Sequence, residues 1–466
     1  MEAQNQNSYL GTAPISKLIW KMAPPTIVAQ LVNLLYNIVD RIYIGHIAEV
    51  GATALTGVGL VTPILMIVTA FAMLASAGGA SRSAIAMGQG NREEADRILG
   101  NCFTLLLIFA VFLTITLLST AEPLLMLFGA SENTLPYALQ YMRIYCCGSI
   151  FVLITMGLNP FLNAQGFSGF SMLTTILGAV TNIVLDPIFI FVLDMGVAGA
   201  AVATVISQSV SAVFVFWFLT MGKKSILKLR LPAMKLKASV VGPVLGLGVS
   251  AFVMVATESI LSISFNSSLS KFGGDLSVGA MTIITSCSQL ISMPTQGLVQ
   301  GCLPIISFNF GAGNKDRVKQ CFRIILTCAA GYTTLFCAAT LLAPQLFVRI
   351  FNNDAALVQH TAWAMRIYMA GIFSLGFQMT CQQTFMALGQ AKVSLLLACL
   401  RKLILLIPLI FILPLFFQNQ VMAVFLAEPF SDIVAAAVTV TVFFGRFDRI
   451  LTAGPGAIGR GNGKVQ

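Results

Sequence analysis

The chain has 466 residues, of which 57% are hydrophobic and only 9% are charged, and its net charge is +10. A soluble domain carries about a quarter charged residues, so this composition excludes a soluble globular protein and predicts an all-α polytopic membrane protein. In such a chain the positive charge indicates membrane topology and contact with anionic lipids, so we expect no nucleic-acid partner. Ten cysteines without C-x-x-C spacing and only two histidines argue against a transition-metal site.

Apolar runs separated by polar or Gly/Pro/Asn turns predict twelve transmembrane helices. Their approximate limits are 16–45, 54–80, 96–120, 134–158, 168–193, 197–221, 239–266, 277–308, 320–344, 357–380, 392–416 and 420–445.

The first predicted span carries a polar stripe through its middle. Four polar residues follow one another at spacings of three or four, namely Gln30, Asn33, Asn37 and Asp40. These spacings place all four side chains on one face of a helix. A charge in hydrocarbon costs about 3 kcal/mol, so the stripe must face a watery cavity or an ion site. Pro24 and Pro25 precede it and remove two backbone donors, which predicts a hinge.

Spans 5 and 6 place further oxygen-bearing side chains at the depth of Asp40. Asn182 and Asp186 lie four residues apart on one helix face, and Thr204 lies two turns into span 6. Such a group suits a hard cation such as Na⁺, and two close carboxylates equally suit a proton. These residue types do not indicate whether Na⁺ or a proton binds. Pro187 discourages a regular helix after Asp186, which would free backbone carbonyls for an ion.

Three more carboxylates lie inside predicted spans of the second half, at Glu258, Glu428 and Asp432. Like the others they must be paired, hydrated, protonated or bound to cations. For any of the five carboxylates, and most of all for Glu428 and Asp432, the alternative is a structural ion pair with Arg41, Arg143 or Arg366. Aromatic and methionine side chains such as Tyr36, Met156 and Met293 are expected to line an adaptable cavity.

Lysine and arginine positions orient the spans. With a cytoplasmic amino terminus, 22 of the 27 basic residues fall on the inner side, among them Arg401, Lys402, Arg460 and Lys464. The positive-inside rule therefore predicts that both termini are cytoplasmic.

An internal repeat divides the chain into two halves. Gly88-Gln-Gly-Asn91 returns as Gly311-Ala-Gly-Asn314, and Met142-Arg-Ile-Tyr145 returns unchanged as Met365-Arg-Ile-Tyr368, both at an offset of 223 positions. The repeat predicts two six-helix lobes related by a pseudo-twofold axis along the membrane normal, which is transporter architecture. The expected units are an N-lobe (1–221), a basic cytoplasmic linker (222–238), a C-lobe (239–445) and a flexible cytoplasmic tail (446–466).

Four runs along the chain carry a family resemblance. They are Asn37-Ile-Val-Asp40 before Gly45-His46, Asn182-Ile-Val-Leu-Asp186-Pro187, Gly196-Val-Ala-Gly199-Ala-Ala, and Gln300-Gly301-Cys-Leu-Pro304-Ile-Ile-Ser307-Phe-Asn309-Phe-Gly311-Ala-Gly313-Asn314. Together they resemble the multidrug and toxic compound extrusion (MATE) family over nearly the full chain, in particular its bacterial MepA-like branch beside DinF.

The resemblance implies a multidrug efflux antiporter that exports bulky, mostly cationic organic compounds in exchange for H⁺ or Na⁺. It implies a site at Asp40, Asn182, Asp186 and Thr204, with Asn159 and Asn163 as polar lining nearby. Glu258 sits where NorM-like relatives carry a glutamate, but span 10 has no acidic residue, which favours the N-lobe. We expect a monomer without cofactor in a bacterial plasma (inner) membrane, where it would contribute to xenobiotic export and antibiotic resistance.

Other functions stay open as alternatives. A flippase for lipid-linked sugars needs cationic residues that hold a pyrophosphate, whereas the predicted spans bury five acids against three arginines. A membrane-embedded enzyme is disfavoured because no His/Cys/Ser constellation appears, and the lobe duplication disfavours a passive channel.

Overall fold

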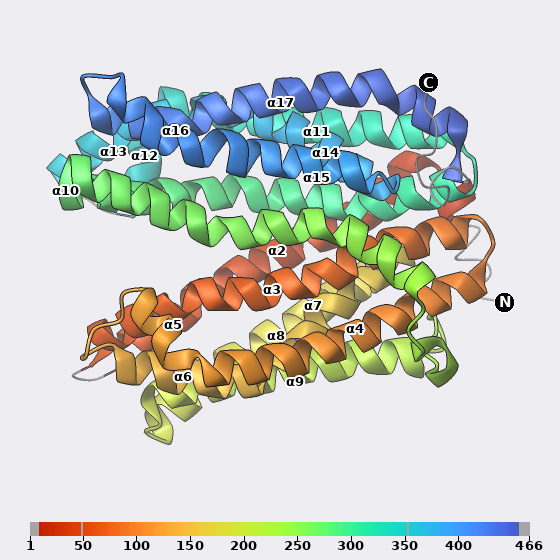
Figure 1. Ribbon diagram of the computed structural model, residues 1–466, viewed down its shortest axis with the longest axis horizontal. Coiled ribbons are helices and arrows are strands. Elements are labelled where there is room, and N and C mark those ends of the chain that lie inside the picture. The colour runs from red at the N-terminus through yellow and green to blue at the C-terminus, as the bar shows by residue number, and fades with distance from the viewer. Residues whose placement is uncertain (1–8, 48–49, 352–353, 456–466) are drawn as a thin grey trace.

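A computed structural model of the chain describes residues 9–47, 50–351 and 354–455. Helices dominate this part of the chain, and no strand occurs within it (Figure 1). The first half consists of α2 (Ile15–Gly45), α3 (Gly51–Gly88), α4 (Arg92–Ser119), α5 (Ala121–Leu127), α6 (Leu135–Cys147), α7 (Ser149–Ala164), α8 (Ser168–Pro187), the π-helical turn η1 (Ile188–Val192) and α9 (Gly196–Thr220).

The second half begins with the longest helix. It consists of α10 (Ala238–Gly311), α11 (Lys315–Leu342), α12 (Pro344–Arg349), α13 (Ala355–Tyr368), η3 (Met369–Gly371), α14 (Phe373–Ala387), α15 (Ala391–Cys399), the π-helical η4 (Leu400–Leu406), α16 (Ile407–Ile412), η5 (Leu413–Leu415) and α17 (Gln420–Ala453). In Figure 1 the two halves form separate bundles, and α10 packs against α2 and α3 between them.

Most of the predicted spans are confirmed. Ten helices among the described residues are long and apolar enough to cross a membrane, and the pair α6 and α7, bent by 57° at their junction, also meets this test when taken together. The span predicted at 357–380 is built from α13 and α14, which are separated by the 3-10 turn η3 and do not meet this test. Polar residues in α14, such as Gln378, Gln382 and Gln383, lower its hydropathy.

Several predicted limits are wrong. Spans 7 and 8 are longer than expected and meet at Gly274, whose φ of 63° breaks α10 into two helices. The helix α17 continues to Ala453, into the stretch predicted as a flexible tail. Residues 456–466 of that tail, including Arg460 and Lys464, lie outside the described residues.

The internal repeat appears in the backbone. Gly90 and Gly313 both have φ of 77°, and Gly166 and Gly389 have φ of 84° and 74°. Each pair is separated by 223 positions, and each glycine ends a helix in the left-handed conformation that only glycine adopts without cost. The two halves therefore repeat the same turn geometry as well as the same residues.

The linker between the lobes is held against α4 and the end of α7 by hydrogen bonds with buried side chains. The Gln165 Oε1 atom accepts hydrogen bonds from the backbone N–H groups of Ile226 (2.7 Å) and Leu227 (2.9 Å). The Asn101 Nδ2 group donates to the carbonyl oxygens of Ala233 (3.0 Å) and Lys235 (3.1 Å). The linker is thus an ordered segment that fastens to α4 and α7.

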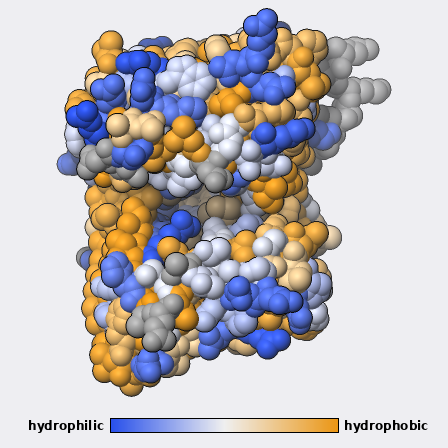
Figure 2. Space-filling view, turned by 90° about the vertical axis from the view of Figure 1, so that its left-hand side faces the viewer, coloured by the Kyte–Doolittle hydropathy of each residue, from blue (hydrophilic) through white to orange (hydrophobic). Residues whose placement is uncertain are grey.

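The lobes touch closely at the end of the molecule where α2 begins and α17 ends. A Cβ atom added to Gly311 would lie 2.1 Å from the Ile85 carbonyl oxygen, and one added to Gly88 would lie 2.0 Å from that of Phe308. The two backbones therefore pack without side chains between them. At the opposite end, Figure 2 shows a hollow between the two lobes. The structure is thus closed at one end and open at the other.

This close contact predicts the effect of a single methyl group. We expect Gly311→Ala to destabilise the protein by about 1–3 kcal/mol, because the backbones of α3 and α10 must move apart. The matched control is Gly331→Ala on α11, where an added Cβ meets no atom within 4 Å. Thermal unfolding in detergent measures both variants, and equal melting temperatures for the two would contradict the prediction.

Candidate functional site

One cavity inside the N-lobe collects most of the side chains that we expected to line a binding site. Six of them face it, namely Gln30, Asn33, Tyr36, Met156, Asn159 and Asn163. The polar face of α2 forms one wall, and α7 forms another. Hydrogen-bonding groups therefore alternate with apolar ones, as in sites that bind organic molecules.

Three expected lining residues lie elsewhere. Asn37 is exposed, and its Nδ2 group donates to the Asn33 carbonyl oxygen of its own helix (2.7 Å). Glu258 and Met293 belong to α10 and do not line the N-lobe cavity. None of the three lines this cavity, since neither helix spacing nor residue type reports how a helix is rotated against its neighbours. Their place in a binding cavity stays a prediction.

Several cavity residues were missed. They are mostly small hydroxyl residues and amides, namely Thr26, Thr155, Ser171, Thr175, Ser207, Gln208, Ser211 and Gln300. One signal was available, because Ser171 and Thr175 on α8 and Ser207 and Ser211 on α9 repeat at a spacing of four residues. Gln300 had no such signal, because it reaches the cavity from the C-lobe helix α10.

Next to the cavity, four predicted residues come together from three helices. Asp40 on α2, Asn182 and Asp186 on α8, and Thr204 on α9 are 9%, 0%, 0% and 2% exposed. The Asn182 Nδ2 group donates to Asp186 Oδ1 (3.1 Å) and lies 3.5 Å from Thr204 Oγ1. Asp40 brings a second carboxyl group near that of Asp186, from the helix α2 that packs against α8. We call these four residues the N-lobe carboxylate site.

Three oxygen atoms of this site lack a partner among the residues that the structure describes. They are Asp40 Oδ1, Asn182 Oδ1 and Asp186 Oδ2. Buried polar atoms are nearly always hydrogen-bonded, and a buried acceptor without a donor costs about 1–3 kcal/mol. An alkali cation would be coordinated by such oxygens, and a proton shared by the two carboxyl groups would remove one of the charges. The site therefore has the chemistry of a binding place for a small cation.

The three prolines behave differently. Pro187 ends α8, and the chain continues as the π-helical turn η1, which confirms the predicted irregularity after Asp186. Pro24 and Pro25 lie inside α2, which is one continuous helix from Ile15 to Gly45. Their role as a hinge stays a prediction.

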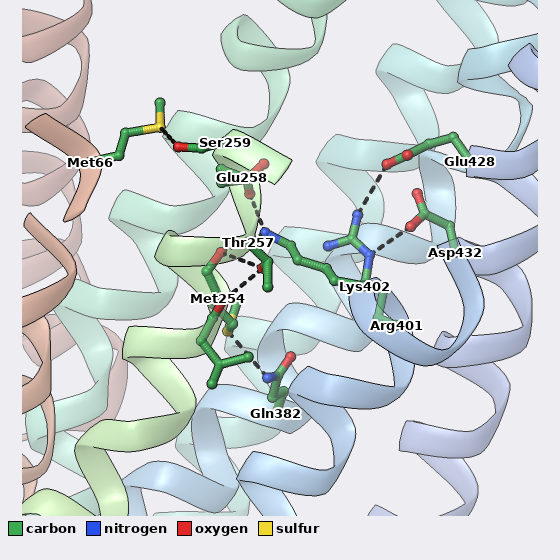
Figure 3. A network of polar contacts seen from close by, with 11 residues as sticks. Met66, Met254, Thr257, Glu258, Ser259, Gln382, Arg401, Lys402, Glu428 and Asp432 are labelled. Carbon is green, nitrogen blue, oxygen red and sulfur yellow. Dashed lines mark hydrogen bonds and ion pairs between the residues drawn. The ribbon is translucent and has the colours of Figure 1, made fainter. Parts of the chain in front are cut away.

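The C-lobe contains an ion-pair network that we call the C-lobe charge cluster (Figure 3). The Arg401 Nε atom donates to Asp432 Oδ1 (2.7 Å), and its Nη2 atom lies 3.5 Å from Glu428 Oε1. The Lys402 ammonium group pairs with Glu258 and donates to the Met254 carbonyl oxygen (2.8 Å). Lys402 is 5% exposed at its side chain, whereas that of Glu258 is 52% exposed.

This cluster corrects two expectations. Arg401 and Lys402 were assigned to the cytoplasmic side, but they lie in η4, inside the span 391–415. The partner of Glu428 and Asp432 is Arg401, while Arg41, Arg143 and Arg366 are exposed. Sequence counting missed this pairing because a basic residue near a predicted helix end resembles a topogenic one. The comparison of five buried acids with three buried arginines, which argued against a flippase, therefore no longer holds.

No group of three or more His, Cys, Asp or Glu residues with metal-site geometry occurs within 9–47, 50–351 and 354–455. The ten cysteines are free thiols.

The fold and its paired halves define a two-lobed, multi-pass membrane protein of the transporter type. A family model described as MatE matches residues 25–188 and 250–412. Multidrug export protein MepA of Staphylococcus haemolyticus is 23% identical over 405 residues, which cover 87% of this chain and 88% of that protein. The protein of the same name from Staphylococcus aureus is 22% identical over 405 residues, with the same coverage.

Solved structures show the same fold. The crystal structure of MATE in the bent conformation is 24% identical and covers 96% of this chain and 98% of its own, with a TM-score of 0.89. The outward-facing conformation of a multidrug resistance MATE family transporter of the MOP superfamily matches with a TM-score of 0.87 and 24% identity, over 95% and 98% of the two chains. The MatE matches cover more than half of this chain, which therefore belongs to the MATE family.

The charge cluster predicts unequal effects for its two cations. We expect Arg401→Met to destabilise the protein by about 3–5 kcal/mol, because two buried carboxylates lose their cation. Lys402→Met should cost less, because its partner Glu258 is half exposed and gains hydration. Thermal unfolding in detergent compares the two with Arg366→Met, an exposed control on α13. A melting temperature of Arg401→Met equal to that of the control would contradict the prediction.

Proposed function

We propose that this protein is a multidrug efflux antiporter that exports bulky organic cations in exchange for an inward-moving H⁺ or Na⁺. The observation that carries the proposal is the N-lobe carboxylate site, whose three unpartnered oxygens lie beside a cavity lined by amides and hydroxyls. The names of the MepA relatives, which are multidrug export proteins, support drugs as the substrate class.

The exchange follows from charge. An organic cation in the cavity is stabilised by the ionised Asp40 and Asp186, and a small cation bound at these carboxylates removes that stabilisation. Each ligand then weakens the binding of the other by the same free energy, which is the linkage that an antiporter requires. Tyr36 joins the two regions, because it lines the cavity and lies four residues, about one helical turn, before Asp40 on α2.

In this proposal the two lobes move relative to each other, so that the cavity opens to one side of the membrane and then to the other. The N-lobe (1–221) and the C-lobe (239–445) rock about their shared interface, with the linker (222–238) and both termini on the cytoplasmic side of a bacterial plasma membrane. The hollow in Figure 2 then faces outward, where the coupling ion enters. Pro24 and Pro25 act as the hinge of α2, since neither supplies a backbone donor.

The flippase alternative receives no support from the C-lobe charge cluster. Arg401 and Lys402 are the buried cations of the C-lobe charge cluster, and both are already paired with carboxylates. A pyrophosphate would have to displace three negative charges from them.

The proposal predicts the outcome of one substitution. Asp40→Asn should lower cation-driven dye efflux at least tenfold, because one of the two carboxylates that bind the coupling ion is lost. Efflux of a lipophilic dye cation from proteoliposomes is measured under a proton gradient and, separately, under a sodium gradient, which also identifies the ion.

The matched control is Asp194→Asn, which removes an exposed carboxylate beyond η1 while leaving the site intact. Efflux by Asp40→Asn at the rate of this control, with equal amounts of inserted protein, would exclude the assigned site.

A further inference from the structure

The sequence run that begins at Gln300 has no role in the exchange described so far, yet it forms the C-lobe side of the interface with α2. Gln300 lies on α10 and lines the N-lobe cavity together with Thr26 and Gln30 of α2. The Gln30 Nε2 group donates a hydrogen bond to Gln300 Oε1 (3.2 Å). A C-lobe side chain therefore forms part of a cavity that otherwise belongs to the N-lobe.

The surrounding contact is tight. The buried Thr26 hydroxyl lies 2.7 Å from the Gly297 carbonyl oxygen of α10. A Cβ atom at Gly297 would lie 2.7 Å from Ile27 Cα, and one at Gly301 would lie 2.2 Å from Thr26 Oγ1. The backbones of α2 and α10 are thus in direct contact here, and the side chains of Gln30 and Gln300 are polar groups that can rotate beside this contact. This contact extends to both sides of Pro24 and Pro25, since a Cβ atom at Gly301 would also lie 2.9 Å from the Met22 carbonyl oxygen.

We propose that Gln300 is a specificity-determining residue whose Oε1 atom accepts a hydrogen bond from a cationic N–H group of the substrate. The inference rests on the proposed function and names the substrate class of the same cavity. In this proposal the N–H group of a protonated amine takes the place of the Gln30 Nε2 group as the donor to Gln300 Oε1. The Gln300 oxygen therefore stays hydrogen-bonded, and its new donor carries a positive charge. Hydrogen bonds with a charged partner are about twice as strong as neutral ones, which favours the exchange.

The exchange has a consequence for the lobes. The bond between Gln30 and Gln300 joins α2 to α10 and is lost when the substrate takes its place. An amine in the cavity therefore loosens the contact between the lobes beside Pro24 and Pro25. A quaternary cation without an N–H group binds the same cavity through its charge alone and leaves the bond intact.

Two probe cations separate this role from a general loss of binding. Protonated 9-aminoacridine has N–H donors and tetraphenylphosphonium has none. Their dissociation constants are measured by equilibrium binding to the purified full-length protein in detergent. We expect Gln300→Ala to raise the dissociation constant of aminoacridine five- to tenfold, about 1–1.4 kcal/mol, and to change that of tetraphenylphosphonium less than twofold. Gln289→Ala, at an exposed position of α10, is the matched control.

The outcomes distinguish this inference from the proposed function. Equal effects of Gln300→Ala on the two cations, or no effect on either, would overturn the inference while leaving drug export in place. Wild-type protein that binds neither cation would overturn the proposed function and this inference with it. Gln300→Glu provides a folded comparison if the alanine variant is unstable, and it should tighten aminoacridine more than tetraphenylphosphonium because its carboxylate still accepts the N–H bond.

A second measurement follows the lobes. Cys147 on α6 and Cys328 on α11 are exposed, one in each lobe, so spin labels on them report the distance between the lobes once the partly exposed Cys399 is replaced by alanine. Aminoacridine should shift or broaden the distance distribution of the otherwise wild-type protein, whereas tetraphenylphosphonium should not. Identical distributions with both cations would overturn the coupling to the lobes.

Discussion

Carboxylates inside a membrane-embedded bundle need a partner, because an ionised group loses its hydration there. The two lobes meet this requirement in different ways. In the C-lobe, Arg401 and Lys402 bring positive charge to Glu428, Asp432 and Glu258. In the N-lobe, Asp40 and Asp186 face each other and an amide, and part of their oxygens stay without a donor among the described residues. The carboxylates that have no cationic side chain beside them are the ones that can bind a free ion.

The repeat shows how this difference arises. The helices α8 and α15 begin 223 positions apart, at Ser168 and Ala391. At the same offset, Gly178 and Ala179 correspond to Arg401 and Lys402. The two small residues line the N-lobe cavity and leave space in it, whereas their counterparts extend long side chains that pair with carboxylates in the C-lobe. The π-helical stretch η4 carries both cations, and no such stretch occurs at this point of α8.

The helix α2 connects the parts of the proposed mechanism. Its polar face reaches from Gln30 in the cavity to Asp40 in the carboxylate site, ten residues or about 15 Å along a helix. Its other contact runs along α10, where glycines allow the backbones to touch. A change in charge at Asp40 and a change in occupancy at Gln30 therefore act on the same helix, which is the physical basis for the coupling that we propose between ion and substrate.

Much of this organisation was determined by the sequence alone. The helical class, most of the spans and the two-lobe repeat followed from apolar length and a constant offset, because these are properties of a single helix or of two copies of one motif. Equal depth in the predicted spans pointed to Asp40, Asn182, Asp186 and Thr204 as one group. The tertiary structure decided which faces of different helices meet. It paired Arg401 with Glu428 and Asp432, turned Asn37 away from the cavity and brought Gln300 into it, since helix rotation and contacts between distant segments are set by packing and leave no local pattern in the chain.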